Sequence, residues 1–134
     1  MIFVDSNIFI DLIDPQSDWY EWSQEKIVDP ADDLVINHVV LAEVARQFAS
    51  LAEQQNYFAT LGVLVELLDE KAAFRAGQAH NAYHRAGGVR EGILADFLIG
   101  AHAATLGATL LTRDRQRFAA YFPELTLITP ETHP

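Results

Sequence analysis

The sequence contains no cysteine, few basic residues and no long uninterrupted run of apolar residues. The absence of cysteine excludes disulfides and thiolate metal sites, and it fits the reducing cytoplasm in which we expect the protein to act. A membrane-spanning helix needs about 20 mostly apolar residues in succession, and no such segment occurs. The N-terminus also lacks a basic segment ahead of an apolar one. We therefore expect neither a membrane span nor a secretory signal.

Acidic residues outnumber basic ones, with 19 Asp and Glu against 9 Lys and Arg, which gives a formal net charge of −10. This balance argues against a protein that holds nucleic acid mainly through a basic surface, because phosphate contacts require positive charge. It is compatible with a cationic partner or with a site that recruits metal ions. Half of the 134 residues are hydrophobic, which is enough for the core of one domain, expected to span residues 1–134.

Short apolar runs alternate along the chain with segments of helical periodicity. The run 63–68 is ambiguous between strand and helix, and Asn37 is placed to cap the helix that follows it. Strands are expected within residues 2–5, 32–38, 108–112 and 125–129. Helices are expected over residues 7–13, 18–28, 39 to about 51, 54–61, 70–85, 95–106 and near 115–120.

Alternating strands and helices predict an α/β fold with a central, mainly parallel sheet that helices cover on both faces. Ligand sites of such open sheets lie outside the carboxyl ends of the strands. Asp5 follows the first expected strand directly, and Asp114 lies just past the strand within 108–112. Because an isolated buried carboxylate is costly, each of these acids needs a partner or a bound cation.

Four acidic residues stand in otherwise apolar segments: Asp5, Glu43, Asp96 and Asp114, here called the acidic quartet. They are far apart in the sequence, so only the fold can bring them together. If they converge, their mutual repulsion must be neutralised, and hard divalent cations such as Mg²⁺ prefer oxygen ligands. One or two such ions can activate water and stabilise the leaving oxygen in phosphodiester cleavage, which is the chemistry that the quartet suggests.

Each member of the acidic quartet also has a simpler structural interpretation. Asp5 and Asp114 can cap the helices that follow them, and Asp96 lies in the first helical turn, where the helix dipole favours an acid. Glu43 can pair with Arg46 or Gln47 one turn later on its own helix. Taken singly, none of the four is convincing as a ligand. The combination of two strand-end Asp residues, a helical Glu and a helix-start Asp favours a shared site.

Three segments carry a family resemblance that runs nearly the whole length of the chain. They are FVDSNIFIDL at the start, INHVVLAEVARQF in the middle and ILADFLIGAHAATLGATLLTRDRQRFAAYFPELTLITP at the end. Through them the sequence resembles the PIN-domain ribonucleases, and most closely the VapC toxins of bacterial toxin–antitoxin pairs. The last segment is the most specific, whereas residues 52–92 match only in general character.

This resemblance implies a single-domain, three-layer α/β/α sandwich and an endoribonuclease site that uses Mg²⁺ or Mn²⁺. The acidic quartet would ligate the metal and carry catalysis, and Asn7 and Thr112 match polar positions that support it from a second shell. Many relatives have an acid where Arg117 stands, so the fourth role falls to Asp114. The resemblance also implies a homodimer, an RNA substrate and inhibition by a cognate VapB-like antitoxin.

Arginines near the acidic quartet are candidates for RNA contacts. Arg85 and Arg90 flank a glycine-containing segment that is expected to be a loop, where they can hold phosphates or remain ordinary solvated charges. Arg113, Arg115 and Arg117 make up the one dense basic cluster of the sequence. They can bind phosphate near the metal, or they can pair with the many acids of the protein.

Two further groups of residues are expected to be structural rather than catalytic. His38 and His102 lie close in sequence to quartet acids, and a role as a base or a metal ligand is conceivable but weaker than a structural one. Trp19, Tyr20 and Trp22 can stack on bases, yet they are expected to pack a helix against the core or a partner.

Three rival functions are weighed against the toxin nuclease. A haloacid-dehalogenase-like phosphatase also has an Asp at the end of its first strand, but it resembles DxDxT there, whereas this sequence has DSNIF. Such an enzyme also needs a later lysine, and Lys26 and Lys71 are the only lysines. A non-toxin PIN nuclease of RNA processing is the second rival, and a degenerate PIN module that binds a partner or RNA without catalysis is the third.

Overall fold

The computed structural model describes residues 1–28 and 32–134, which form an α/β fold around a five-stranded sheet in the order β3-β2-β1-β4-β5. All neighbouring strands are parallel, which confirms the predicted class. The strands are β1 (Ile2–Val4), β2 (Leu34–Ile36), β3 (Leu64–Val65), β4 (Thr109–Leu111) and β5 (Leu127–Ile128). The helices are α1 (Ser6–Ile13), α2 (Tyr20–Val28), α3 (His38–Val44), the 3₁₀ turn η1 (Ala45–Gln47), α4 (Leu51–Thr60), α5 (Glu70–Arg85), α6 (Ile93–Leu106) and α7 (Arg115–Tyr121).

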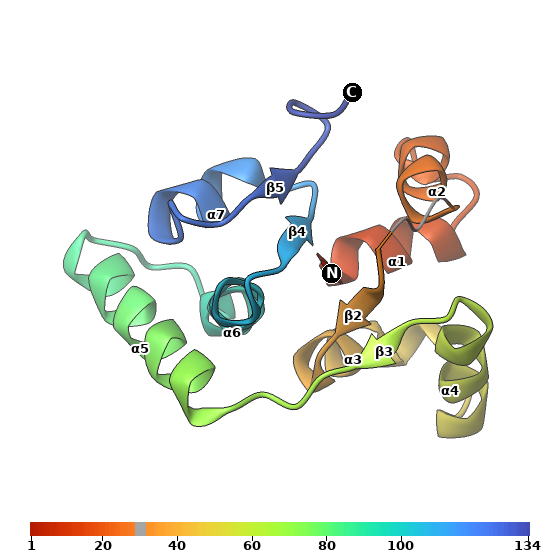
Figure 1. Ribbon diagram of the computed structural model, residues 1–134, viewed down its shortest axis with the longest axis horizontal. Helices are drawn as coiled ribbons and strands as arrows, with labels where there is room; N and C mark the ends of the chain where they lie inside the picture. The colour runs from red at the N-terminus through yellow and green to blue at the C-terminus, as the bar shows by residue number, and fades with distance from the viewer. Residues whose placement is uncertain (29–31) are drawn as a thin grey trace.

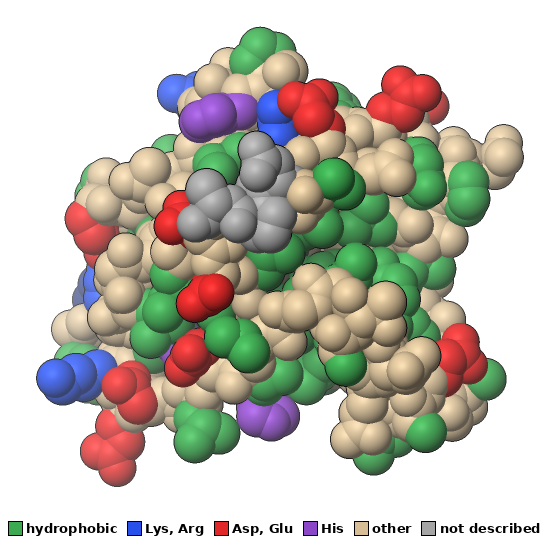
Figure 2. Space-filling view, turned by 45° about the vertical axis from the view of Figure 1, so that its right-hand side comes forward, with side chains coloured by type: hydrophobic (Ala, Val, Ile, Leu, Met, Phe, Trp, Pro, Cys, Tyr) green, Lys and Arg blue, Asp and Glu red, His purple; other side chains and the backbone are tan. Residues whose placement is uncertain are grey.

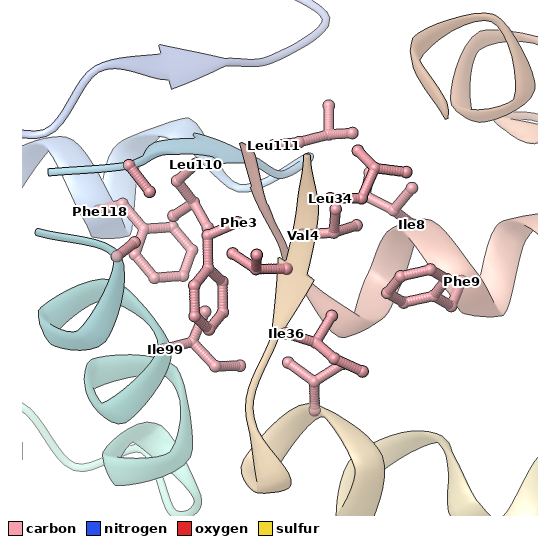
Figure 3. Packing of buried hydrophobic residues seen from close by; sticks show 14 of the residues in the cluster. Phe3, Val4, Ile8, Phe9, Leu34, Ile36, Ile99, Leu110, Leu111 and Phe118 are labelled. Atoms are coloured by element: carbon pink, nitrogen blue, oxygen red, sulfur yellow. The ribbon is translucent and has the colours of Figure 1, made fainter. Parts of the chain in front are cut away.

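Helices cover both faces of the sheet, with α5, α6 and α7 on one side and α1 and α2 on the other (Figure 1). Side chains alternate along each strand and therefore reach both helical layers. In Figure 3, Phe3 and Leu110 lie on the side of α6, while Val4 and Leu111 lie on the side of α1. All four side chains are fully buried, so the sheet stabilises the fold through both of its faces.

Capping residues fix where several helices begin and end. Asn37, fully buried, accepts hydrogen bonds from the backbone of Val39 at 3.0 Å and Val40 at 3.2 Å, which confirms its predicted role at the start of α3. Asp69 caps α5 through the Ala72 amide at 2.9 Å. Gly107 ends α6 with a φ of 66°, a left-handed conformation that glycine adopts without strain.

The expected helix from 39 to about 51 is wrong at its C-terminal end. The helical segment stops at Gln47, and Phe48 takes an extended conformation with φ −119° and ψ 144°. The Phe48 ring packs against Tyr57 and Phe58 of the next helix, with centroids 5.3 Å and 6.3 Å apart. This aromatic cluster turns the chain, and Ser50 then caps α4 through the Glu53 amide at 3.1 Å.

The ambiguous run 63–68 contains a two-residue strand, β3, at the edge of the sheet, and both of its side chains are exposed.

Acidic side chains are scattered over the face of the molecule in Figure 2, and few basic ones accompany them, as the net charge requires. In the part of the chain that the structure describes, no helix is both long and apolar enough to cross a bilayer.

Candidate metal centre

Asp5 and Asp114 lie at the same end of the sheet, beyond the carboxyl ends of the central strand β1 and its neighbour β4. Strands β1 and β4 pair in register, with Val4 opposite Leu111, and the Asp5 amide donates to the Leu111 carbonyl at 2.9 Å. Asp5 directly follows β1, and Asp114 lies three residues beyond β4 at the start of α7. Adjacent parallel strands end side by side, so residues more than 100 positions apart share one site.

Asp5 is a buried carboxylate, 3% exposed, that is held by four hydrogen-bond donors, of which the Ser6 hydroxyl at 3.5 Å is the most distant. The Thr112 hydroxyl donates to it at 2.7 Å, the Ser6 amide at 2.8 Å and the Asn7 side-chain amide at 3.3 Å. Burial nevertheless raises the pKa of Asp5 to about 6, since the hydrogen bonds from Thr112 and Ser6 offset it only in part. The predicted supporting role of Asn7 and Thr112 is consistent with these contacts.

Thr112 connects Asp5 to Asp114. Its side chain, which is fully buried, donates to Asp5 and accepts a 3.0 Å hydrogen bond from the Asp114 amide. The Asp114 side chain accepts from the Arg117 amide at 3.4 Å and so caps α7, as the structural interpretation of this acid predicted. Capping uses one carboxylate oxygen of Asp114, Oδ1, and the second oxygen, Oδ2, faces the side chain of Arg117.

Asp96 lies in the first turn of α6 and joins the site through an arginine. The Arg117 Nη1 atom lies 2.7 Å from Asp96 Oδ2 and 3.0 Å from Asp114 Oδ2, so one nitrogen bridges two carboxylates. Burial, together with the negative charges of Asp5 and Glu43, raises the pKa of Asp96 to about 7, and the positive charge of Arg90 opposes this shift. Arg117, in direct contact, also favours the charged form.

Glu43 completes the acidic quartet from α3. Burial raises its pKa, and the Ser6 hydroxyl acts in the opposite direction. The negative charge of Glu43 in turn raises the pKa values of both Asp5 and Asp96, which places the three carboxylates in one electrostatic neighbourhood. No ion pair with Arg46 was found among the described residues, so the interpretation of Glu43 as a partner of Arg46 along the helix receives no support.

The donor set of the site suits a hard divalent cation. Every candidate ligand atom is an oxygen, and two buried oxygens, Glu43 Oε1 and Asn7 Oδ1, have no hydrogen-bond partner among residues 1–28 and 32–134. Over the same residues, no three acidic or histidine side chains stand close enough to hold a metal without rearrangement. The candidate ligands are therefore of the chemical type that Mg²⁺ or Mn²⁺ binds. Arg117 lies between two of them, Asp96 and Asp114.

The candidate RNA-binding arginines differ in how far they are already engaged. Arg113 Nε lies 2.7 Å from Asp11, and its guanidinium carbon lies 5.8 Å from the centre of the Trp19 ring, so this side chain has structural partners. Arg85, Arg90 and Arg115 are exposed. The cavity beside Asp114 measures about 570 Å³ and is lined by Asn7, Arg113, Asp114, Arg115, Gln116 and Glu131.

Of the residues expected to be structural, His102, Trp19 and Trp22 have structural contacts, whereas His38 is exposed. His102 is 1% exposed, with its Nδ1 atom 3.1 Å from the Asn37 amide nitrogen and its ring edge-on to Phe3. Trp22 donates to the His133 carbonyl at 2.8 Å, and its ring meets that of Trp19 at a centroid distance of 6.3 Å.

Sequence reasoning missed two contributors to the site and one acid beside it. Ser6 lies against Asp5 and Glu43, and its position directly after Asp5 was the available signal. Arg117 bridges Asp96 and Asp114, and the one signal for this role in the sequence was that Arg117 stands three residues after Asp114. Asp11 is 3% exposed and accepts hydrogen bonds from two serine hydroxyls in addition to its ion pair. Its place inside an amphipathic helix gave no sign of these partners.

Comparisons with known proteins identify the family of this chain. The sequence model of the PIN domain matches residues 2–122, so the chain belongs to the PIN-domain family. A search of curated proteins found no match.

Solved structures of toxin–antitoxin proteins share the fold. VapBC2 from Rickettsia felis bound to a promoter DNA fragment is similar with a TM-score of 0.70 at 23% identity, covering 96% of this chain and 98% of that chain. VapBC-1 from nontypeable Haemophilus influenzae gives the same values. VapC20 from Mycobacterium tuberculosis, described as a Sarcin-Ricin loop cleaving toxin, gives a TM-score of 0.69 at 18% identity, covering 90% and 95%.

Proposed function

We propose that this protein is a metal-dependent endoribonuclease and the toxin of a VapBC-type toxin–antitoxin pair. The observation that supports the proposal is that acids of the quartet lie near the carboxyl ends of β1 and β4, where burial first and neighbouring negative charges second raise the pKa values of Asp5 and Asp96. Membership of the PIN-domain family and the fold shared with VapBC structures support the choice of RNA as the substrate.

The chain's own residues would divide the work as follows. Asp5, Asp96 and Asp114 would hold Mg²⁺ or Mn²⁺, with Glu43 as a ligand directly or through water. When bound, the metal would activate water and stabilise the leaving oxygen of the phosphodiester bond. Glu43 Oε1, buried and without a hydrogen-bond partner in the described residues, is suited to accept a hydrogen bond from the attacking water. Thr112 keeps Asp5 oriented toward the site.

The RNA backbone would approach from the cavity beside Asp114. Arg115 is exposed at this cavity and has no ion-pair partner among residues 1–28 and 32–134 that it would have to leave in order to contact a phosphate. Arg113 lines the same cavity while its guanidinium is held by Asp11. Since few basic residues are available, local arginines and the metal together must offset the repulsion between the acidic protein and RNA.

An antitoxin partner is part of the proposal. VapBC and FitAB complexes are among the solved structures with this fold, and we propose a VapB-like protein as the inhibitor and a homodimer as the active form. Co-expression with a VapB-like protein that binds this chain should restore growth that the nuclease arrests. Sedimentation of the purified protein should give the mass of two chains.

RNA cleavage by the purified, partner-free protein tests the proposed function. Total cellular RNA is incubated with Mg²⁺, with Mn²⁺ or with a chelator, and fragments are separated and their ends mapped. We expect discrete fragments that require metal. Asp96→Asn should lower the cleavage rate at least about 100-fold, because one ligand charge is lost from the site.

Asp18→Asn serves as the matched control, since Asp18 is an exposed acid on the segment between α1 and α2. This variant should cleave like the unmodified protein. Metal-independent fragments, or fragments of equal yield with Asp96→Asn, would contradict the proposed activity and indicate a contaminating nuclease. Absence of cleavage together with absence of metal binding would favour a module that binds without catalysis.

A further inference from the structure

The structure places a positively charged side chain where the proposed metal would have to act. Arg117 belongs to α7, and its Nη1 atom is within 3.0 Å of one oxygen from Asp96 and one from Asp114. Asp96 comes from α6, so the arginine ties two different helices together at the acidic quartet. The side chains of Arg117 and Asp96 are only 16% and 17% exposed, which shields their ion pair from solvent.

Arg117 and a divalent cation make competing demands on the same two oxygens. A small hard cation requires carboxylate oxygens at about 2.0–2.6 Å, whereas an arginine nitrogen occupies the space at hydrogen-bond distance from them. One nitrogen already lies between Asp96 Oδ2 and Asp114 Oδ2. A metal ion held between these two oxygens would need the space that the nitrogen occupies, so the guanidinium must withdraw before the ion can bind there. The charges of the two cations also repel each other.

We propose that Arg117 is a built-in counter-cation that competes with divalent metal for Asp96 and Asp114 and thereby lowers the metal affinity of the acidic quartet. Arg117 is a positioning residue in this scheme, because without metal it holds the two carboxylates together and limits their repulsion. The inference rests on the proposed function, since it concerns the metal that the quartet would hold.

The surroundings of Arg117 allow the side chain to withdraw without disturbing the fold. A cavity of about 340 Å³ adjoins it, lined in part by Tyr83, Arg90, Asp114 and Tyr121. A long, flexible arginine side chain can move into such a space by changing its rotamer. In that position its charge would lie close to Arg90 and remain near the site, where an RNA phosphate could become its new partner.

The start of α7 does not depend on the guanidinium. The helix is capped by Asp114 Oδ1, which accepts from the backbone amide of Arg117 rather than from its side chain. Replacement by glutamine keeps this amide and most of the aliphatic stem. Arg117→Gln should therefore fold, and its effect on metal binding can be separated from a loss of structure.

Calorimetric titration with Mn²⁺ at pH 8 tests the proposal on the purified chain. We expect Arg117→Gln to bind Mn²⁺ at least about ten-fold more tightly than the unmodified protein, because one competing positive charge is removed. Arg115→Gln is the matched control. It removes the same charge from an exposed position on the same helix and should change the affinity by less than about three-fold.

Thermal unfolding gives a second readout that does not depend on catalysis. In a chelator, Arg117→Gln should melt at a lower temperature than the unmodified protein, because Asp96 and Asp114 lose their shared partner. Added Mn²⁺ should then raise the melting temperature of Arg117→Gln more than that of the unmodified protein. Arg117→Lys, which keeps the charge on a side chain without the planar fork, should fall between them in both measurements.

Unchanged or weaker Mn²⁺ binding by Arg117→Gln would overturn the role of Arg117 as a competitor, while the proposed nuclease function would stand. Equal tightening by Arg115→Gln would also overturn it, since the effect would then come from net charge alone. If neither the unmodified protein nor Arg117→Gln binds Mn²⁺, the proposed metal site fails, and the competition fails with it.

Discussion

Removal of the Thr112 hydroxyl is the simplest test of how hydrogen bonds at the acidic quartet stabilise the fold. Thr112→Val replaces it with a methyl group of nearly the same shape, so the packing is kept and one buried donor is lost. Asp5 loses its 2.7 Å hydrogen bond and the Asp114 amide loses its 3.0 Å acceptor. A hydrogen bond to a charged group contributes about 1.5–3 kcal/mol, so we expect a loss of about 2–3 kcal/mol at pH 8.

Urea denaturation in the presence of a chelator measures this loss as a fall in the free energy of unfolding at constant slope. The pKa of Asp5 should also rise above about 6, because the Thr112 hydrogen bond holds it down. The cost of Thr112→Val should consequently be smaller at pH 5, where the Asp5 carboxyl is protonated in the folded state.

Thr105→Val is the control, since this exposed threonine donates only to a carbonyl of its own helix, that of His102 at 3.1 Å. Its loss should remain within about 0.5 kcal/mol. A loss for Thr112→Val that is no larger than that of Thr105→Val, or equal losses at pH 5 and pH 8, would refute the view that Thr112 stabilises a charged Asp5.

Three further predictions follow from the same contacts. Because the pKa values of Asp5 and Asp96 are raised to about 6 and about 7, the metal-free protein should lose about 4 kcal/mol of unfolding free energy between pH 5 and pH 8. Urea denaturation measures this loss, and an unfolding free energy that does not change with pH would contradict it. Glu43→Gln removes the charge of a partly buried carboxylate and should raise the metal-free stability at pH 8 by on the order of 1 kcal/mol while abolishing cleavage; a loss of stability would contradict it. Gly100→Ala would place a Cβ atom 2.6 Å from the Phe122 ring and should lower the free energy of unfolding by about 1–3 kcal/mol in urea, and an unchanged value would contradict the tight packing of α6.

Local patterns were sufficient to predict most of the fold. The period of the apolar residues predicted a helix over 70–85, and the structure confirms both bounds of α5. The end of α3 was beyond such reasoning, because Phe48 leaves the helix to pack against rings of α4. The two-residue strand β3 was ambiguous for the same reason, since pairing with β2 defines it rather than its own sequence.

The candidate site shows a similar division between local and distant contacts. The acids were identifiable because carboxylates in apolar segments are unusual and because two of them follow strands. The hydrogen bond between Thr112 and Asp5 joins residues at opposite ends of the chain, and the resemblance alone suggested that Thr112 supports the quartet. The contact of Arg117 with Asp96 spans 21 positions and two helices, and no local pattern encodes it.

The location of bound metal tests the central claim most directly. Crystals soaked in Mn²⁺ can be measured at a wavelength where manganese scatters anomalously, which reveals the ion independently of the refined coordinates. The account predicts a peak within about 2.5 Å of carboxylate oxygens from Asp5, Asp96 or Asp114, with the Arg117 guanidinium displaced. A peak elsewhere, or no peak at a Mn²⁺ concentration that supports RNA cleavage, would contradict the assignment of the acidic quartet as the metal site.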